Sequence, residues 1–276
     1  MTNTPRNYLN NRDLLAEIHK SKTSYCSFTD PKFHQYDIIV HSISEINSKA
    51  INQAKQNQAK RLSILEYNHR KSQGEKVKLS DCEVSIKKIS KYDLVFRVMT
   101  YDHIPLNPSR KKKAKTIADH HEKVNFKPFQ HWKFNQDDEL VCVGKSHWSG
   151  DLITGHFDNK CGKITNNLAL MMFKLCERYA TKGNVRMYTY NDEMISQAIL
   201  QLTAVGLQFD ESKSDNPFSY LTSCVTNSFV RVLNIEKMHQ EIRDDLLEAH
   251  GLTPSSTRQY SEDYDVSERR TVDDHD

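Results

Sequence analysis

Apolar residues recur at the spacing of an α-helix throughout the last third of the chain. The first stripe predicts a helix that Thr165 or Asn166 can cap and that ends at Lys182-Gly183-Asn184. A second stripe predicts a helix over Asn191–Leu207. The members of the first stripe are Leu168, Met171, Met172, Leu175 and Tyr179, and those of the second are Met194, Ile195, Ala198, Ile199, Leu202 and Val205.

A third helix is predicted from Pro217 to about Gln240, and its sides differ in chemistry. Asp215 or Asn216 can cap it, and proline is favoured at the first helical position. Its expected core stripe comprises Phe218, Leu221, Val225, Phe229 and Val232. A polar row follows on another side and comprises Tyr220, Ser223, Asn227, Arg231, Asn234 and Lys237. Tyrosine can stack on a base, and asparagine and arginine can bond base edges or phosphates. The pattern alone does not decide whether this row faces solvent or nucleic acid, and it favours neither.

Weaker patterns precede these helices. Asn10 or Asn11 can cap a helix over Asp13–Lys22, with Leu14, Leu15 and Ile18 on its apolar side. Residues 50–70 are rich in Ala, Gln, Lys and Arg and nearly lack apolar periodicity, which predicts an exposed helix or a linker. Between residues 82 and 163, short apolar runs separated by turn signals predict a partly β lobe. Those runs are Leu94–Tyr101, Val124–Phe134 and Leu140–Val143.

The patterns together predict a mainly α protein in which a helical bundle carries an inserted, partly β lobe. The expected segments are an N-terminal helix and connector (1–51), a basic insertion (52–163), a helical domain (164–254) and an acidic, disordered tail (255–276).

Charge is spread unevenly over these segments. Residues 52–163 carry 22 Lys and Arg against 13 Asp and Glu, and residues 239–276 carry 4 Arg against 11 Asp and Glu. The basic run Arg110–Lys115 could contact phosphates, since clustered cations displace counterions from nucleic acid. A basic middle beside an acidic end suggests a polyanionic partner, although a solvated surface explains the charges as well.

Catalytic and metal-binding motifs give little signal. The sequence contains no GxSxG, HExxH or phosphate-binding glycine loop, so we expect no catalytic residue. Cys142 with His147, and His156 with Cys161, have spacings that zinc permits but does not require, so we expect no metal and no cofactor. A nucleic-acid-modifying enzyme in residues 82–163 stays an alternative that bound zinc would favour. The six cysteines form no CxxC pair, and the chain shows neither a signal-peptide pattern nor an apolar run that could span a membrane, which predicts a reduced, cytoplasmic protein.

Three consecutive segments carry a resemblance to a known family. They are LALMMFKLCERYATKGN, NDEMISQAILQLTAVGLQFD and NPFSYLTSCVTNSFVRVLNIEK, in which an apolar helix, a D/E-L/M-I-x-E/Q helix and a Phe-Asp turn precede S-Y-x-T. In this order and spacing they resemble region 2 of bacterial RNA polymerase sigma factors. With the start NYLNNRDLLAEIHKSK, the chain resembles the late-transcription sigma factors of T4-like bacteriophages more closely. The resemblance covers residues 7–22 and about 163–254 and implies a sigma region 2-like helical bundle.

The resemblance implies partners and roles for particular residues. Asp192, Glu193 and Gln197 would bind the clamp helices of the host RNA polymerase core. Tyr220, Ser223, Asn227, Arg231 and Asn234 would face an AT-rich minus-ten promoter element, with Lys237 near the DNA backbone. A phage sliding clamp and a late coactivator are further partners that the resemblance suggests, and it implies a location in the host cytoplasm at the nucleoid. A sigma-like adaptor that binds polymerase without reading a promoter is the alternative.

One departure from the family affects strand opening. Housekeeping sigma factors carry adjacent tryptophans shortly after the S-Y-x-T tyrosine, whereas this chain has Ser223-Cys224 there. We therefore expect the third helix to read DNA better than it opens DNA alone.

Overall fold

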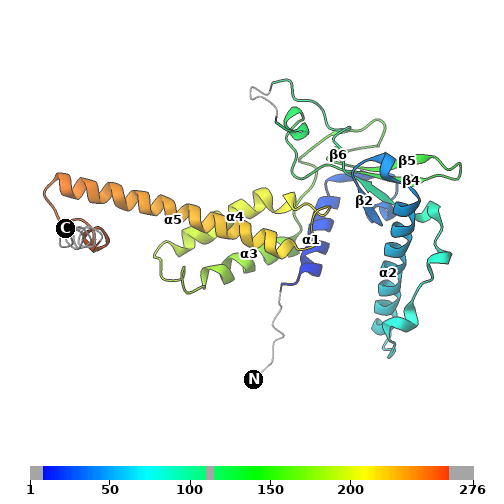
Figure 1. Cartoon of the computed structure of the whole chain (residues 1–276), viewed down its shortest axis with the longest axis horizontal. Coiled ribbons are helices and arrows are strands. Elements are labelled where there is room, and N and C mark those ends of the chain that lie inside the picture. The colour runs from blue at the N-terminus through cyan, green and yellow to red at the C-terminus, as the bar shows by residue number, and fades with distance from the viewer. Residues whose placement is uncertain (1–8, 110–114, 261–276) are drawn as a thin grey trace, which may run out of the picture. The chain divides into compact units, whose positions relative to one another are not determined.

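The computed structural model describes residues 9–109 and 115–260 of the chain (Figure 1). These residues form two compact units. The first unit contains residues 1–172 and 203–221, and the second contains residues 173–202 and 222–276. The expected run Arg110–Lys115 falls almost wholly outside the described residues, as does the tail after residue 260.

The first unit is built on a five-stranded mixed sheet with the strand order β1-β5-β4-β3-β2. Its strands are β1 (Cys26–Phe28), β2 (Ile38–Val40), β3 (Phe96–Val98), β4 (Gln130–Phe134) and β5 (Leu140–Ser146). β2 runs parallel to β3, while the other neighbours are antiparallel. A separate pair joins β6 (Trp148–Ser149) to β7 (His156–Phe157).

The partly β lobe is confirmed, but it is larger than the sequence pattern indicated. The runs around residues 94–101, 124–134 and 140–143 supply the three inner strands. Both edge strands come from the first 40 residues, which the pattern assigned to a connector. Residues 52–163 therefore share one sheet with residues 26–40 and do not form a separate insertion.

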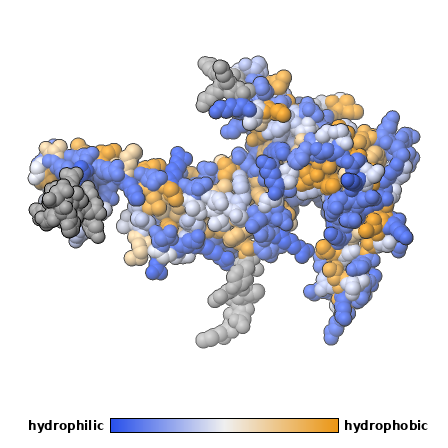
Figure 2. Space-filling model, viewed as in Figure 1, coloured by the Kyte–Doolittle hydropathy of each residue, from blue (hydrophilic) through white to orange (hydrophobic). Residues whose placement is uncertain are grey.

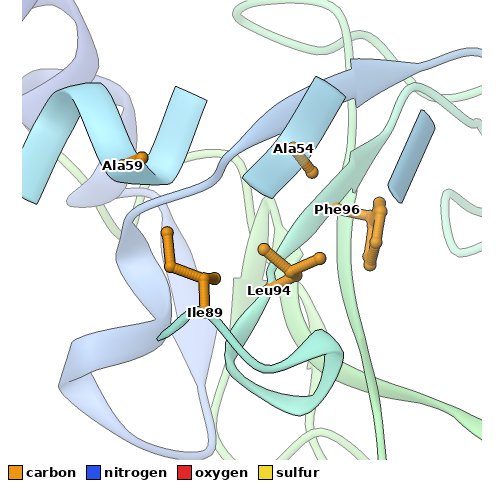
Figure 3. Close-up of a cluster of buried hydrophobic side chains, with 5 residues drawn as sticks. All are labelled: Ala54, Ala59, Ile89, Leu94 and Phe96. Carbon is orange, nitrogen blue, oxygen red and sulfur yellow. The ribbon is translucent and has the colours of Figure 1, made fainter. Parts of the chain in front are cut away.

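Helix α2 (Ser48–Ser72) packs on this sheet and is not a linker. Asn47 caps it by accepting hydrogen bonds from the backbone N–H groups of Lys49 and Ala50. Ala54 and Ala59 have small side chains that let the helix approach a buried cluster in the sheet and its neighbouring loop, which Figure 3 shows. The members of the cluster are Ala54, Ala59, Ile89, Leu94 and Phe96. The expected boundary after residue 51 falls inside this helix.

Short elements complete the first unit. Helix α1 (Asn11–Thr23) begins after Asn10, whose side chain accepts a hydrogen bond from the Asp13 N–H, and it buries Leu14 and Ile18 as expected. The 3-10 helices are η1 (Pro31–His34), η2 (Ile43–Glu45), η3 (Leu79–Cys82), η4 (Ile86–Lys88), η5 (Lys91–Asp93), η6 (Ile117–His120) and η7 (Gly206–Gln208).

The three predicted amphipathic helices are present as α3 (Asn166–Ala180), α4 (Asn191–Val205) and α5 (Pro217–Ala249). In the second unit, the rings of Tyr179 and Phe229 pack edge to face with centroids 4.9 Å apart. Asn191 ties the start of α4 to the end of α3, because its side-chain amide donates to the carbonyls of Ala180 and Val185. The mainly helical character expected from the sequence therefore holds.

Two details of the third helix differ from the prediction. Phe218 was expected in the core stripe, but it is 38% exposed, whereas Leu221, Val225, Phe229 and Val232 are buried. The helix also continues past Gln240 to Ala249. Residues 256–260, expected to be disordered, are helical and attached to α5, because Ser255 donates from its N–H and its hydroxyl to the Asp244 carboxylate. None of the helices in the described residues combines the length and apolar character that crossing a bilayer requires.

Candidate functional site

The polar row of α5 begins with a residue that is already engaged. The Tyr220 hydroxyl donates a 2.8 Å hydrogen bond to the Val205 carbonyl, and its ring lies 5.6 Å from that of Phe209. All three residues belong to the first unit. Tyr220 thus fastens the end of α4 to the start of α5, and stacking on a base would require it to give up this bond.

The other members of the row lie on the surface of the second unit. Ser223, Asn227, Arg231, Asn234 and Lys237 are all exposed. Apart from Ser223, their side chains make no hydrogen bond or ion pair within the described residues. These polar groups are therefore available to an external partner.

The three residues expected to contact polymerase lie in the first two turns of α4. Asp192, Glu193 and Gln197 are all exposed. Glu193 Oε1 accepts a 2.9 Å hydrogen bond from the Gln197 side-chain amide one turn later. This bond orients the amide oxygen and the second carboxylate oxygen outward as acceptors, which suits a cationic partner.

A groove of about 660 Å³ in the second unit brings the two predicted sets together. From α4 it is lined by Glu193, Gln197, Leu200 and Gln201, and from α5 by Cys224, Asn227, Ser228, Arg231, Val232, Ile235, Glu236 and His239. Sequence reasoning assigned Glu193 and Gln197 to one surface and Asn227 and Arg231 to another, but all four line this groove. Ser223, Asn234 and Lys237 do not line it.

An apolar stripe on α5 continues beyond the groove. Ile235, Met238, Ile242 and Leu246 follow at spacings of three and four, which places them on one helix face, and all four are exposed. Figure 2 shows orange hydrophobic residues among blue ones along α5 (Figure 1). The pattern is regular, but two of its four members, Ile242 and Leu246, lie beyond the predicted helix end at Gln240, so sequence reasoning missed it.

Sequence reasoning also missed a buried cluster of charges in the first unit. The Glu211 carboxylate, in the turn between α4 and α5, lies 3.0 Å from Lys22 Nζ of α1 and 2.8 Å from Arg97 Nη1 of β3. It also accepts a 2.8 Å bond from the Tyr36 hydroxyl. The Arg97 guanidinium lies between the rings of Tyr36 and Phe129, 3.8 and 3.9 Å from their centroids.

The net positive charge of this cluster explains the protonation of its members. Burial alone would raise the pKa of Glu211, but Arg97 and Lys22 outweigh it and lower that pKa to about 2. Burial, and more weakly the positive charge of Arg97, lower the pKa of Lys22 and outweigh its contact with Glu211. Burial and the nearby Arg97 lower the pKa of His19 to about 3, so this histidine is neutral. The cluster is filled, with only about 10 Å³ of space beside Glu211, and it serves to join α1, the sheet and the turn.

Two buried histidines of the lobe are used internally. His131 lies between Arg97 Nε, 3.0 Å from its Nε2, and the Phe33 carbonyl, 2.7 Å from its Nδ1. His147 is buried against the ring of Phe126, and burial lowers its pKa to about 3. Across residues 9–109 and 115–260, no group of three or more His, Cys, Asp and Glu could hold a metal ion. Neither cysteine–histidine pair considered for zinc therefore has further ligands there.

Comparison with known proteins assigns no family to this arrangement. No protein-family model, no curated protein and no solved structure matches the chain, so the groove, the polar row and the sequence motifs are what indicate its function.

Proposed function

We propose that this protein is a sigma factor of the region 2 type, which binds RNA polymerase core and directs it to AT-rich, minus-ten-like promoters of phage late genes. The polymerase performs the chemistry, and this chain supplies binding free energy and promoter choice. The order of motifs in α3, α4 and α5 supports the proposal, as does the position of the groove on the last two of these helices.

The observation that carries the proposal is the polar row of α5. Asparagine and serine are poor helix formers, so an exposed run of them weakens a helix unless it has a use. Asn227, Arg231, Asn234 and Lys237 face outward without side-chain partners in the described chain. Amide and guanidinium groups in this arrangement can bond base edges, and the lysine can bond a phosphate.

The groove suits the polymerase side of the proposal. Its α4 wall presents the Glu193 carboxylate and the Gln197 amide beside the apolar Leu200, which is 62% exposed. A basic, amphipathic helix of the polymerase clamp would meet both a charge complement and an apolar contact there. Gln197 stands where an acidic residue is common in the family, so a hydrogen bond replaces one charge pair.

Strand opening is where this chain would need help. This helix has Ser223 and Cys224 where the family carries tryptophans, and the hydroxyl of the nearby Tyr220 is bonded to the Val205 carbonyl. An unstacked base gains about 1–3 kcal/mol from an aromatic partner, and these two positions supply none, because the exposed ring of the helix, Phe218, lies at its start. The phage sliding clamp and the late coactivator would compensate for the missing base-stacking contact.

The shared groove keeps the adaptor alternative open. Because Asn227 and Arg231 line the same groove as Glu193 and Gln197, a single protein partner could occupy all four. Under that alternative the chain binds polymerase without reading a promoter.

Two double variants separate the functions. Glu193→Ala with Gln197→Ala changes only the α4 wall, whereas Asn234→Ala with Lys237→Ala changes the row outside the groove. The first pair should abolish co-elution with core polymerase. The second should leave co-elution unchanged and reduce promoter-specific initiation by about 10- to 100-fold, since a lost base or phosphate contact costs about 1–3 kcal/mol. Lys174→Ala with Glu177→Ala, both exposed on α3, is the matched control.

The transcription assay contains core polymerase, a TATAAATA-like late promoter, the sliding clamp and the coactivator. Absence of initiation by the wild-type protein under these conditions would refute the proposal. Absence of initiation by the wild-type protein, together with co-elution that only the α4 variant loses, would establish the adaptor instead. Unchanged initiation with the Asn234 and Lys237 variant would show that the outer part of the polar row does not read the promoter.

A further inference from the structure

The outward face of α2 carries a row of basic and amide side chains that Ile64 and Tyr67 interrupt. The inward face is fixed by the sheet, where Ala54, Gln58 and Ala59 are buried. The opposite face carries Lys49, Gln53, Gln56, Lys60, Tyr67 and Lys71, all exposed except the half-buried Tyr67. No promoter or polymerase contact of the proposed function uses this face.

The lysines of this face are regularly spaced. Lys49, Lys60 and Lys71 are separated by eleven residues each, which is three helical turns with a rotation of only about 20°. Their Cα atoms therefore lie about 16 Å apart along a row of about 33 Å. Lys71 Nζ lies 5.6 Å from the centroid of the Tyr67 ring, which holds the last ammonium group over this face.

The row lacks the acidic residues that normally accompany exposed lysines. Solvated helix faces commonly pair Lys with Glu one turn away. In α2 the one acidic residue is Glu66, and its carboxylate is taken by Arg70 at 2.6 Å. Arg61 is likewise bound to the buried Asp37 at 2.8 Å. Within the described part of the chain, Lys49, Lys60 and Lys71 have no carboxylate partner.

We propose that this α2 face is a second nucleic-acid-binding surface, which contacts the phosphate backbone of duplex DNA without reading its sequence. The lysines neutralise phosphates, and the Gln56 amide donates hydrogen bonds to phosphate oxygens. Gln53 contributes its second amide N–H, because the first donates to the Asn57 side chain at 3.1 Å. The row contains no carboxylate that would repel a polyanion.

The dimensions fit a duplex. One turn of B-form DNA is about 34 Å long and contains two strands, so a straight rod laid along it meets a phosphate ridge about every 17 Å on average. The row of about 33 Å spans one full turn, so its two end lysines can meet the same strand while Lys60 lies between them, facing the other strand. The surface belongs to the first unit, whereas the groove and the exposed part of the promoter row belong to the second.

The test measures binding of the full-length protein to a 30-base-pair duplex of random sequence, without polymerase, by fluorescence anisotropy over a range of salt concentrations. The triple variant Lys49→Gln, Lys60→Gln, Lys71→Gln keeps helix propensity and polarity while it removes three charges. The control removes three exposed lysines scattered over the chain, as Lys160→Gln, Lys174→Gln, Lys213→Gln.

Each lost phosphate contact reduces the slope of log K against log salt by about 0.9, so the α2 variant should lose about 2.7 from the slope. At 0.1 M salt the same contacts amount to a loss of up to about 500-fold in affinity. The slope of the control variant should fall by less than about 0.9, the value for one phosphate contact.

Equal slopes for the two triple variants would overturn the proposal, as would absence of wild-type binding at 50 mM salt. Tighter binding to an RNA hairpin of equal length, lost in the α2 variant, would overturn the assignment to DNA. Because the duplex carries no promoter and no polymerase is present, the outcome does not depend on the proposed role in transcription.

Discussion

Replacing Glu211 tests whether the buried charge cluster holds the first unit together. Glu211→Gln keeps the size of the side chain and a bond to the Tyr36 hydroxyl, but it leaves Lys22 and Arg97 without their shared anion. The Glu211 side chain is only 6% exposed, so water cannot replace the lost charge. Breaking a buried ion pair in this way costs about 3–5 kcal/mol.

The pH dependence gives a second, independent magnitude. The pKa of Glu211 falls from its usual 4.5 to about 2 in the folded protein. A depressed pKa contributes stability that is present above pH 4.5 and is lost as the pH falls towards 2. This difference corresponds to about 3 kcal/mol at neutral pH.

Tryptophan fluorescence during urea unfolding measures both effects, because the only two tryptophans, Trp132 and Trp148, belong to the first unit. The free energy of unfolding should fall by about 3–5 kcal/mol at pH 7 in Glu211→Gln. The difference between the variant and the wild type should shrink below pH 4.5, as the wild-type carboxylate becomes protonated. Glu83→Gln, at an exposed glutamate of the same unit, is the control. This account of the cluster would be refuted if the variant lost less than about 1 kcal/mol of unfolding free energy at pH 7 and destabilised below pH 4.5 as the wild type does.

Two further predictions concern helix α5. Phe229→Ala removes a ring that is 1% exposed and packs on Tyr179, so it should destabilise the helices by about 3–5 kcal/mol, whereas Phe218→Ala should cost less than about 1 kcal/mol. Circular dichroism should register the first loss while tryptophan fluorescence stays unchanged; equal effects of the two variants would contradict the burial pattern. Asp244→Ala removes both acceptors of Ser255, so hydrogen exchange should accelerate at residues 256–260. Since these bonds lower the pKa of Asp244, acid should loosen the same segment in the wild type as the pH falls through that pKa, and unchanged protection would count against the contact.

The sequence predicts the helical part of the fold well because its signals are local. Leu168, Met172 and Leu175 repeat at helical spacing and are buried, and Pro217 marks the start of α5. The edge strands β1 and β2 have three residues each, too few for a period to show. Their pairing depends on partners far along the chain, such as Ser146 for Cys26.

The sequence motifs indicate four of the residues that line the groove but not their arrangement. Motif positions identify Glu193, Gln197, Asn227 and Arg231, while the packing of α4 against α5 decides that they share one groove. The Glu211 cluster has no local signature at all. Lys22 and Glu211 are 189 positions apart, and each resembles an ordinary surface charge in the sequence.

The order of strands in the sheet has a consequence for how the protein is made. Both edge strands are synthesised first, but β1 pairs with β5, which ends at Ser146. At about 5–20 residues per second, a ribosome needs about 5–20 s to proceed from residue 40 to residue 146. During that interval, and until η7 (Gly206–Gln208) is made, the apolar side of α1, with Leu14 and Ile18, lacks the element that α1 packs against. The nascent N-terminus is therefore a natural substrate for a chaperone at the ribosome exit, and slow codons before residue 146 would lengthen its exposure.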